Sequence, residues 1–189
     1  MPGNSSKTQQ QRRTETRQAL LAGARYCFAK NGYQQTSLED IAGHCKLTTR
    51  PVYHYFGSKQ ALFSAVADEL EQELARDMLA LDAKQPGYLQ AIWQVFMDKC
   101  KNRDFRRIVL LEAPVILGRE RWQNNEVVQI ATDILKKRLN YLPEIQARLI
   151  NRMTLVALAE AALMIAEADD SEAYIEAANQ LAKKALKKL

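Results

Sequence analysis

Apolar side chains return every three or four residues along most of this chain, which is the spacing of amphipathic helices. The first such segment covers residues 14–30, and Asn31-Gly32 after it supplies a stop. The pattern predicts a first helix buried along one stripe: Leu20, Leu21, Ala24, Cys27 and Phe28.

Two short helices and one long helix are predicted next. Ser37 begins a segment of about two turns that ends by Lys46, with Asp40 in the capping-box position. Residues 48–56 form a second short segment, and a tight turn separates the two. Ser58 then caps a long amphipathic helix that ends before Gln85-Pro86-Gly87.

The helical pattern continues to the end of the chain. Helices are predicted over residues 88–100, 104–117, 124 or 125–139, 143–168, and from 171 onward, the second of them kinked or ended near Pro114. With about nine helices and no convincing strand, we expect an all-α fold with an N-terminal three-helix domain and a larger C-terminal helical domain.

The last two helices, residues 143–168 and 171–188, are apolar over more of their surface than one modest domain covers. Almost every position between residues 153 and 166 is apolar, and five of those fourteen are alanine. A helix that is apolar all round must be covered all round. We interpret both helices as the interface of a twofold homodimer, the alternative being that they fill the core of a monomer.

Charge distinguishes the first third of the chain from the remainder. Residues 1–60 carry nine Lys and Arg against three Asp and Glu, whereas residues 61–189 carry eighteen against nineteen. The basic excess favours nucleic acid or an anionic surface as partner of the first third. Residues 1–13 are polar, and we expect a flexible basic arm there, followed by a small helical domain over 14–59 and a second domain over 60–189.

Other classes of protein find little support. The longest apolar run is shorter than the roughly 18 residues that span a membrane, and the N-terminus lacks an apolar signal segment, so we expect a cytoplasmic protein. Three widely spaced cysteines and two histidines offer no metal or cofactor site. A small helical enzyme is the weakest hypothesis because no catalytic constellation is visible.

The short helices at 37–45 and 48–56 have the dimensions of a helix-turn-helix, whose second helix enters the major groove of DNA. Thr48 can cap the second helix or face a phosphate, and Arg50 can grip a guanine edge. Tyr53, His54 and Lys59 offer donors to phosphates. Because Pro51 lacks an N–H, the helix begins either after Thr48 or at Pro51 itself, and this decides where Arg50 points.

The run TSLEDIAGHCKLTTRPVYHYFGSKQALF resembles the DNA-binding signature of the TetR family of bacterial regulators over about 45 residues, 17–62. The resemblance implies that Thr36, Thr48, Tyr53 and Lys59 contact phosphates and that Thr49, Arg50 and His54 contact the groove. Lys46 stands where the family has a turn glycine, so it must adopt a left-handed backbone at a cost of roughly 1 kcal/mol or more.

The resemblance implies a dimeric repressor of a pseudo-palindromic operator, released when a small-molecule effector binds the C-terminal domain. Candidate residues for an effector pocket are aromatic, adaptable or acidic, although ordinary core packing explains each of them singly: Trp93, Phe96, Met97, Cys100, Trp122, Glu160 and Met164.

The alternative is a DNA-binding protein of the same fold that acts through a protein partner without a small ligand. A cavity of a few hundred cubic ångströms would favour the ligand-responsive repressor.

Overall fold

The fold is all-α, as the sequence predicted. A computed structural model describes residues 8–118, 120–121 and 124–185, and contains no strand in those ranges. The chain divides into two compact units, residues 1–66 and 67–189. Helix α4 begins in the first unit and continues into the second.

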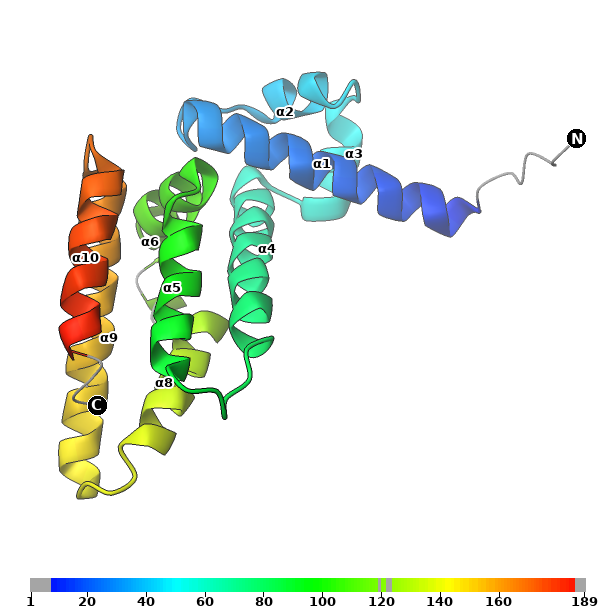
Figure 1. The fold of residues 1–189 in the computed structure, drawn as a ribbon. Helices are drawn as coiled ribbons and strands as arrows, with labels where there is room; N and C mark the ends of the chain where they lie inside the picture. Colours follow the sequence, from blue (N-terminus) through cyan, green and yellow to red (C-terminus); the bar gives the residue numbers. More distant parts are fainter. Residues whose placement is uncertain (1–7, 119, 122–123, 186–189) are drawn as a thin grey trace, which may run out of the picture. The chain divides into compact units, whose positions relative to one another are not determined.

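The first unit contains α1 (Gln9–Asn31), α2 (Leu38–His44), α3 (Thr49–Phe56) and the start of α4 (Lys59–Leu79). Helices α1, α2 and α3 pack on one another (Figure 1). Their shared core is apolar and almost fully buried: Leu20, Phe28, Ile41, Val52, Leu62 and Phe63.

Helix α1 starts earlier than predicted. The prediction of a flexible arm over 1–13 was therefore wrong for residues 8–13. Thr8 caps α1, because its hydroxyl accepts a hydrogen bond from the N–H of Gln11 at 3.2 Å. The Gln11 side chain accepts one in return from the N–H of Thr8 at 2.8 Å. This reciprocal box supports a polar helical turn that has no apolar face to reveal it in the sequence. Residues 1–7 lie outside the described part.

The second unit contains the rest of α4 and then α5 (Tyr88–Cys100), the π-helix η1 (Phe105–Glu112), α6 (Ala113–Ile116), α8 (Glu126–Arg138), α9 (Glu144–Glu167) and α10 (Ser171–Ala185). Helix α9 packs against α8, η1 and α10, and α10 also packs against α5. In Figure 1, α9 and α10 run side by side.

The segment ahead of Pro114 differs most from a regular helix. We predicted a helix over 104–117 that is kinked or ended near Pro114, and the structure has a π-helix to Glu112 followed by the short α6. Pro114 has no N–H, so its α-helical bond to Leu110 cannot form. The N–H of Ala113 donates to the carbonyl oxygen of Ile108 five residues back, which is the π-helical spacing. Such bulges are frequent at functional sites.

Capping residues fix the starts of the later helices. Asn125 caps α8 by accepting from the N–H of Val128 at 2.9 Å. Ser171 is the first residue of α10 rather than its cap, because Asp170 accepts the hydrogen bond from Ala173.

Helix α9 leaves much of its apolar surface uncovered. Its length and composition alone would allow it to cross a membrane, and only 17% of its most apolar window is buried. Its exposed apolar residues recur at intervals of three and four, so they share one face: Ile145, Leu149, Met153 and Val156.

Candidate functional site

Helix α3 presents a polar face opposite its single buried anchor. Val52 is fully buried, whereas Arg50, Tyr53 and His54 are exposed. Tyr53 and His54 follow Arg50 by three and four residues, so the three side chains share one face of the helix. A recognition helix uses such a face to meet base edges and phosphates in the major groove.

The start of α3 answers the question that Pro51 raised. Thr48 has extended backbone angles and occupies the N-cap position, and the helix begins at Thr49. Pro51 is therefore the third helical residue, where its missing N–H has no intrahelical partner to lose. The Thr48 hydroxyl does not form the predicted cap. The hydroxyl and the N–H groups of the first turn therefore remain suited to a phosphate.

The turn between α2 and α3 has the strained geometry that the sequence predicted. Lys46 has φ of 56°, the only positive φ outside glycine among the described residues. Its N–H donates to Gly43, and the N–H of Leu47 donates to Ala42. A glycine adopts this conformation without steric cost, whereas the side chain of Lys46 strains the backbone of the same turn.

The prediction that Thr36 contacts a phosphate was wrong. Its side chain is only 1% exposed, and its hydroxyl lies 2.7 Å from the carbonyl oxygen of Gly32 and 3.2 Å from that of Cys27. Thr36 therefore fastens the end of α1 to the turn that follows it, and its hydroxyl hydrogen is not available to a phosphate.

Lys59 is also engaged inside the first unit. Its ammonium donates to the carbonyl oxygens of Tyr33 at 2.9 Å and Thr36 at 3.0 Å, and lies 4.2 Å from the centre of the Tyr33 ring. Two of its three donors are thus used internally. A phosphate contact from Lys59 stays a prediction that rests on the third donor.

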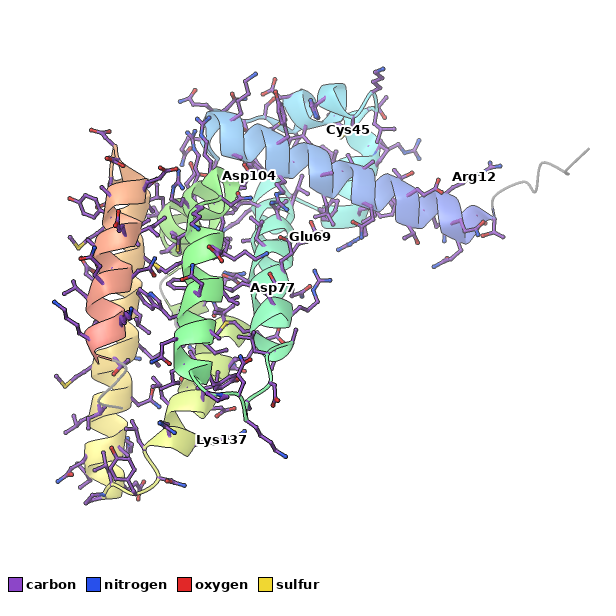
Figure 2. The ribbon with its side chains drawn as sticks, viewed as in Figure 1. Arg12, Cys45, Glu69, Asp77, Asp104 and Lys137 are labelled. Atoms are coloured by element: carbon purple, nitrogen blue, oxygen red, sulfur yellow. The ribbon has the colours of Figure 1, made fainter. Side chains whose placement is uncertain are left out.

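Further cations lie on the exposed side of α1. Arg12 and Arg13 are exposed on its first turns, and Figure 2 shows Arg12 at the N-terminal end of the helix. Arg17 stacks its guanidinium over the ring of Phe56, 5.4 Å from the ring centre. The basic excess of the sequence is therefore partly carried by a helix and not by a loose arm.

The second unit contains a cavity of about 150 Å³. Side chains of α4, α5, η1, α8 and α9 line it, and nearly all of them are apolar. Three described lining residues carry polar side chains: Glu71, Asn125 and Thr154. The cavity therefore suits a small apolar molecule that has few polar groups.

Two of the predicted pocket residues, Trp93 and Phe96, line this cavity. The prediction that Met97 and Cys100 line a pocket was wrong, because both are fully buried and neither contributes to the lining. Burial raises the pKa of the Cys100 thiol to about 12, which keeps it protonated. Trp122 lies outside the described residues.

The prediction that Glu160 and Met164 line a pocket was wrong for a different reason. Both are exposed on α9, where they continue the outward stripe of Met153 and Val156 at helical spacing. The cavity is instead lined by the opposite side of that helix, through Thr154, Leu155, Leu158 and Ala159.

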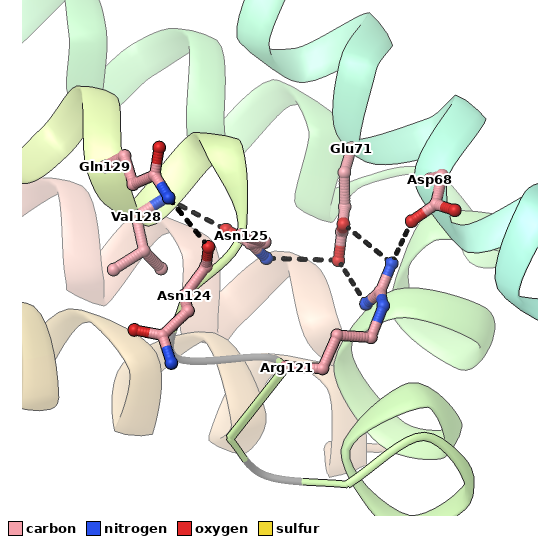
Figure 3. Close-up of polar contacts among 7 residues, drawn as sticks. All are labelled: Asp68, Glu71, Arg121, Asn124, Asn125, Val128 and Gln129. Carbon is pink, nitrogen blue, oxygen red and sulfur yellow. Dashed lines mark hydrogen bonds and ion pairs between the residues drawn. The ribbon is translucent and has the colours of Figure 1, made fainter.

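The sequence analysis missed Glu71, the buried acid of the cavity. Its side chain is 6% exposed, and both of its oxygens pair with the guanidinium of Arg121, at 3.2 and 3.1 Å (Figure 3). Asn125 donates to the same carboxylate at 3.1 Å. Spacing could have revealed Glu71, because Leu74 and Met78 follow it by three and seven residues on the buried stripe of α4.

Comparison with known proteins identifies the family. Residues 20–66 match the family profile "Bacterial regulatory proteins, tetR family", and residues 88–189 match "Tetracyclin repressor-like, C-terminal domain". The chain belongs to the TetR family. Its members are DNA-binding transcriptional regulators, and the family is typically dimeric and ligand-responsive.

Curated relatives of this TetR-family chain match it in part. The transposon Tn10 TetC protein of Escherichia coli is 27% identical over 137 residues, which are 70% of this chain and 66% of TetC. The transcriptional repressor AcnR of Corynebacterium glutamicum is 38% identical over 56 residues, 30% of each chain. This chain thus spans less than two thirds of either relative.

Solved structures match over almost the whole length. A TetR-family transcriptional regulator from Pectobacterium atrosepticum has a TM-score of 0.68 and 27% identity, with 97% of both chains covered. The fatty acid degradation regulator FadR of Bacillus halodurans has the same TM-score at 17% identity, covering 94% of this chain and 96% of FadR, and shows the fold alone. The matches are regulators and not enzymes.

Proposed function

We propose that this chain is a repressor that binds a pseudo-palindromic operator as a homodimer in the cytoplasm and is released by a small-molecule effector. The observation that carries the DNA-binding role is the exposed face of α3, on which Arg50, Tyr53 and His54 lie together. The first third of the chain, which contains this face, also holds the basic excess. Thr48 and Thr49 complete the proposed contacts at the helix start.

The dimer is proposed to form through α9 and α10. The outward stripe of α9 and the exposed Tyr174 and Leu181 of α10 are large apolar side chains on two adjacent helices. Exposed apolar surface of this extent marks an interaction site. A second copy of the chain would cover it by an isologous contact, which also supplies the two recognition helices that a palindrome needs. A stable monomer at micromolar concentration in sedimentation would contradict this interface.

Release by an effector is supported by the cavity of the second unit. At about 150 Å³ it is smaller than we expected from the sequence and below the range typical of drug-sized ligands. A small effector is therefore proposed, and it releases DNA only if it binds the DNA-competent and the released conformation with different affinity. A site of this composition also favours ligand response over the alternative of a regulator that acts only through a protein partner.

Selection of bound genomic DNA by the purified full chain tests the proposal. It should yield a two-fold-symmetric motif with half-sites about one helical turn apart. Arg50→Ala should weaken binding to that motif by about 1–3 kcal/mol and relax the preference at one base pair. Arg76→Ala removes another exposed cation, from α4, and serves as the control. Unchanged affinity and preference in Arg50→Ala would contradict the base contact.

A further inference from the structure

The polar residues of the cavity gather around Glu71 (Figure 3). Glu71, on α4, is one of the three polar side chains of the described lining, and it is the charged one. Asn125 lies next to it. Its amide nitrogen donates a hydrogen bond to Glu71, and its amide oxygen accepts one from the N–H of Val128. The cap of α8 therefore holds Asn125, and Asn125 in turn holds the carboxylate in place.

The Glu71 carboxylate retains room to accept one further hydrogen bond. Its Oε1 accepts from Arg121 and Asn125, and its Oε2 accepts from Arg121 alone among the described residues. A carboxylate offers about four acceptor positions, two on each oxygen. Because Glu71 lines the cavity, we assign the remaining position on Oε2 to an O–H or N–H group of a bound molecule.

Negative charge exceeds positive charge around this end of the cavity. Arg121 pairs with Asp68 as well as with Glu71, so one cation faces two carboxylates. Burial raises the pKa of Glu71, although Arg121 and Asn125 oppose that effect and Asp68 adds to it. A carboxylate ligand placed beside Glu71 would bring a third negative charge into this cluster, and like-charge contact of this kind is strongly unfavourable.

Size restricts the ligand further. An apolar cavity of about 150 Å³ in another protein is known to hold benzene, and this cavity has about that volume. Trp93, Phe96 and Phe105 contribute aromatic rings to its wall. A single-ring molecule fills such a space, whereas a long acyl chain does not.

We propose that the cavity binds a single-ring apolar molecule that carries one neutral or cationic hydrogen-bond donor and no carboxylate, with Glu71 as the acceptor. This proposal rests on the effector role proposed above and specifies the chemical class of the effector. Glu71 thereby discriminates by charge, and the aromatic wall discriminates by shape.

Four probes of matched size test the proposal by calorimetry on the intact full-length protein: benzyl alcohol, benzylamine, benzoate and toluene. Benzyl alcohol and benzylamine should bind at least about tenfold more tightly than benzoate, a difference of about 1.4 kcal/mol, and more tightly than toluene. Glu71→Gln should reduce the preference for benzylamine over benzoate about tenfold or more. Glu69→Gln removes a neighbouring acid of α4 outside the lining and should leave the preference unchanged.

A cavity-filling variant keeps the test decisive if Glu71→Gln does not fold. Ala131→Leu adds three carbon atoms inside the lining, so it should abolish binding of every probe. Benzoate binding as tightly as benzylamine, absence of binding by all four probes, or binding that survives Ala131→Leu would each overturn the inference. Operator binding is measured separately without probes, so its absence would contradict the repressor proposal and not the ligand class.

Discussion

The indole N–H of Trp93 donates a hydrogen bond to the amide oxygen of Asn179, with 2.7 Å between nitrogen and oxygen. Trp93 lines the cavity from α5, and Asn179 lies on α10, which packs against α5 and α9. The bond therefore joins the wall of the proposed effector site to one helix of the proposed dimer interface. A ligand that displaces the indole ring would act directly on α10.

Asn179→Leu is expected to destabilise the second unit by about 1–3 kcal/mol, because it leaves a part-buried indole N–H without its partner. Urea unfolding measures the loss. Gln180→Leu alters an exposed amide on the next residue of the same helix and is the matched control. Equal stability of the two variants would contradict the importance of this bond.

Gly23→Ala is expected to destabilise the first unit by about 1–3 kcal/mol, since overpacking of a tight contact costs that much. A Cβ at Gly23 would collide with the sulfur of Cys45 and lie 3.3 Å from the ring of His44. That ring is already fixed by stacking on Tyr26, with 4.5 Å between the ring centres. Thermal unfolding of the variant measures the effect.

Gly43→Ala is the matched control for that substitution. It also replaces a helical glycine, but outside the glycine's own helix turn and its chain neighbours no atom lies within 4 Å of the new Cβ. We expect neutral behaviour or a gain of about 0.5–1 kcal/mol, because alanine restricts the unfolded chain. A similar loss at both glycines would mean that the contact with Cys45 is not the cause.

Lys46→Gly is expected to stabilise the first unit by about 1 kcal/mol, because glycine adopts the left-handed conformation of this turn without steric cost. The urea midpoint should rise. Lys46→Ala removes the same charge and keeps the Cβ, so its midpoint should stay near that of the parent. A gain in the alanine variant of the same size would assign the effect to charge and not to the backbone.

Lys59→Met is expected to lower the stability of the first unit by about 1.5–3 kcal/mol, because it removes a charged donor from two carbonyl oxygens. Unfolding is measured without DNA, so that a phosphate contact cannot contribute. Lys84→Met, at an exposed position, is the control. Normal stability together with uniformly weaker DNA binding would show that Lys59 acts on phosphate instead.

Alkaline pH should destabilise the protein through Cys100. Burial raises the pKa of this thiol from 9.0 to about 12, so the folded state keeps a proton that the unfolded chain releases. The thiol's contribution to stability is complete below about pH 9 and is lost as pH rises toward 12. Between pH 8 and pH 10, the urea midpoint of the parent should fall more than that of Cys100→Ala. Parallel curves would contradict the raised pKa.

The DNA-binding elements were readable from the sequence because their signals are local. Ser37 and Asp40 form the predicted capping box, with 3.0 Å from the N–H of Asp40 to the hydroxyl and 2.8 Å from the N–H of Ser37 to the carboxylate. The positive φ of Lys46 was likewise expected, because Lys46 stands where the family resemblance places a turn glycine. Spacing alone also placed α5 over Tyr88–Cys100.

Tertiary structure decided which side chains are available for binding. Thr36 resembles a surface hydroxyl in the sequence, but the end of α1 folds over it and uses its hydrogen bonds. Helix α9 is apolar on several sides, so only its packing against α8, η1 and α10 decides that Thr154 lines the cavity and Glu160 faces outward. The pairing of Glu71 with Arg121 joins residues 50 positions apart. Helical periodicity defines the faces of each helix, but the partner of each face depends on long-range packing that no local pattern contains.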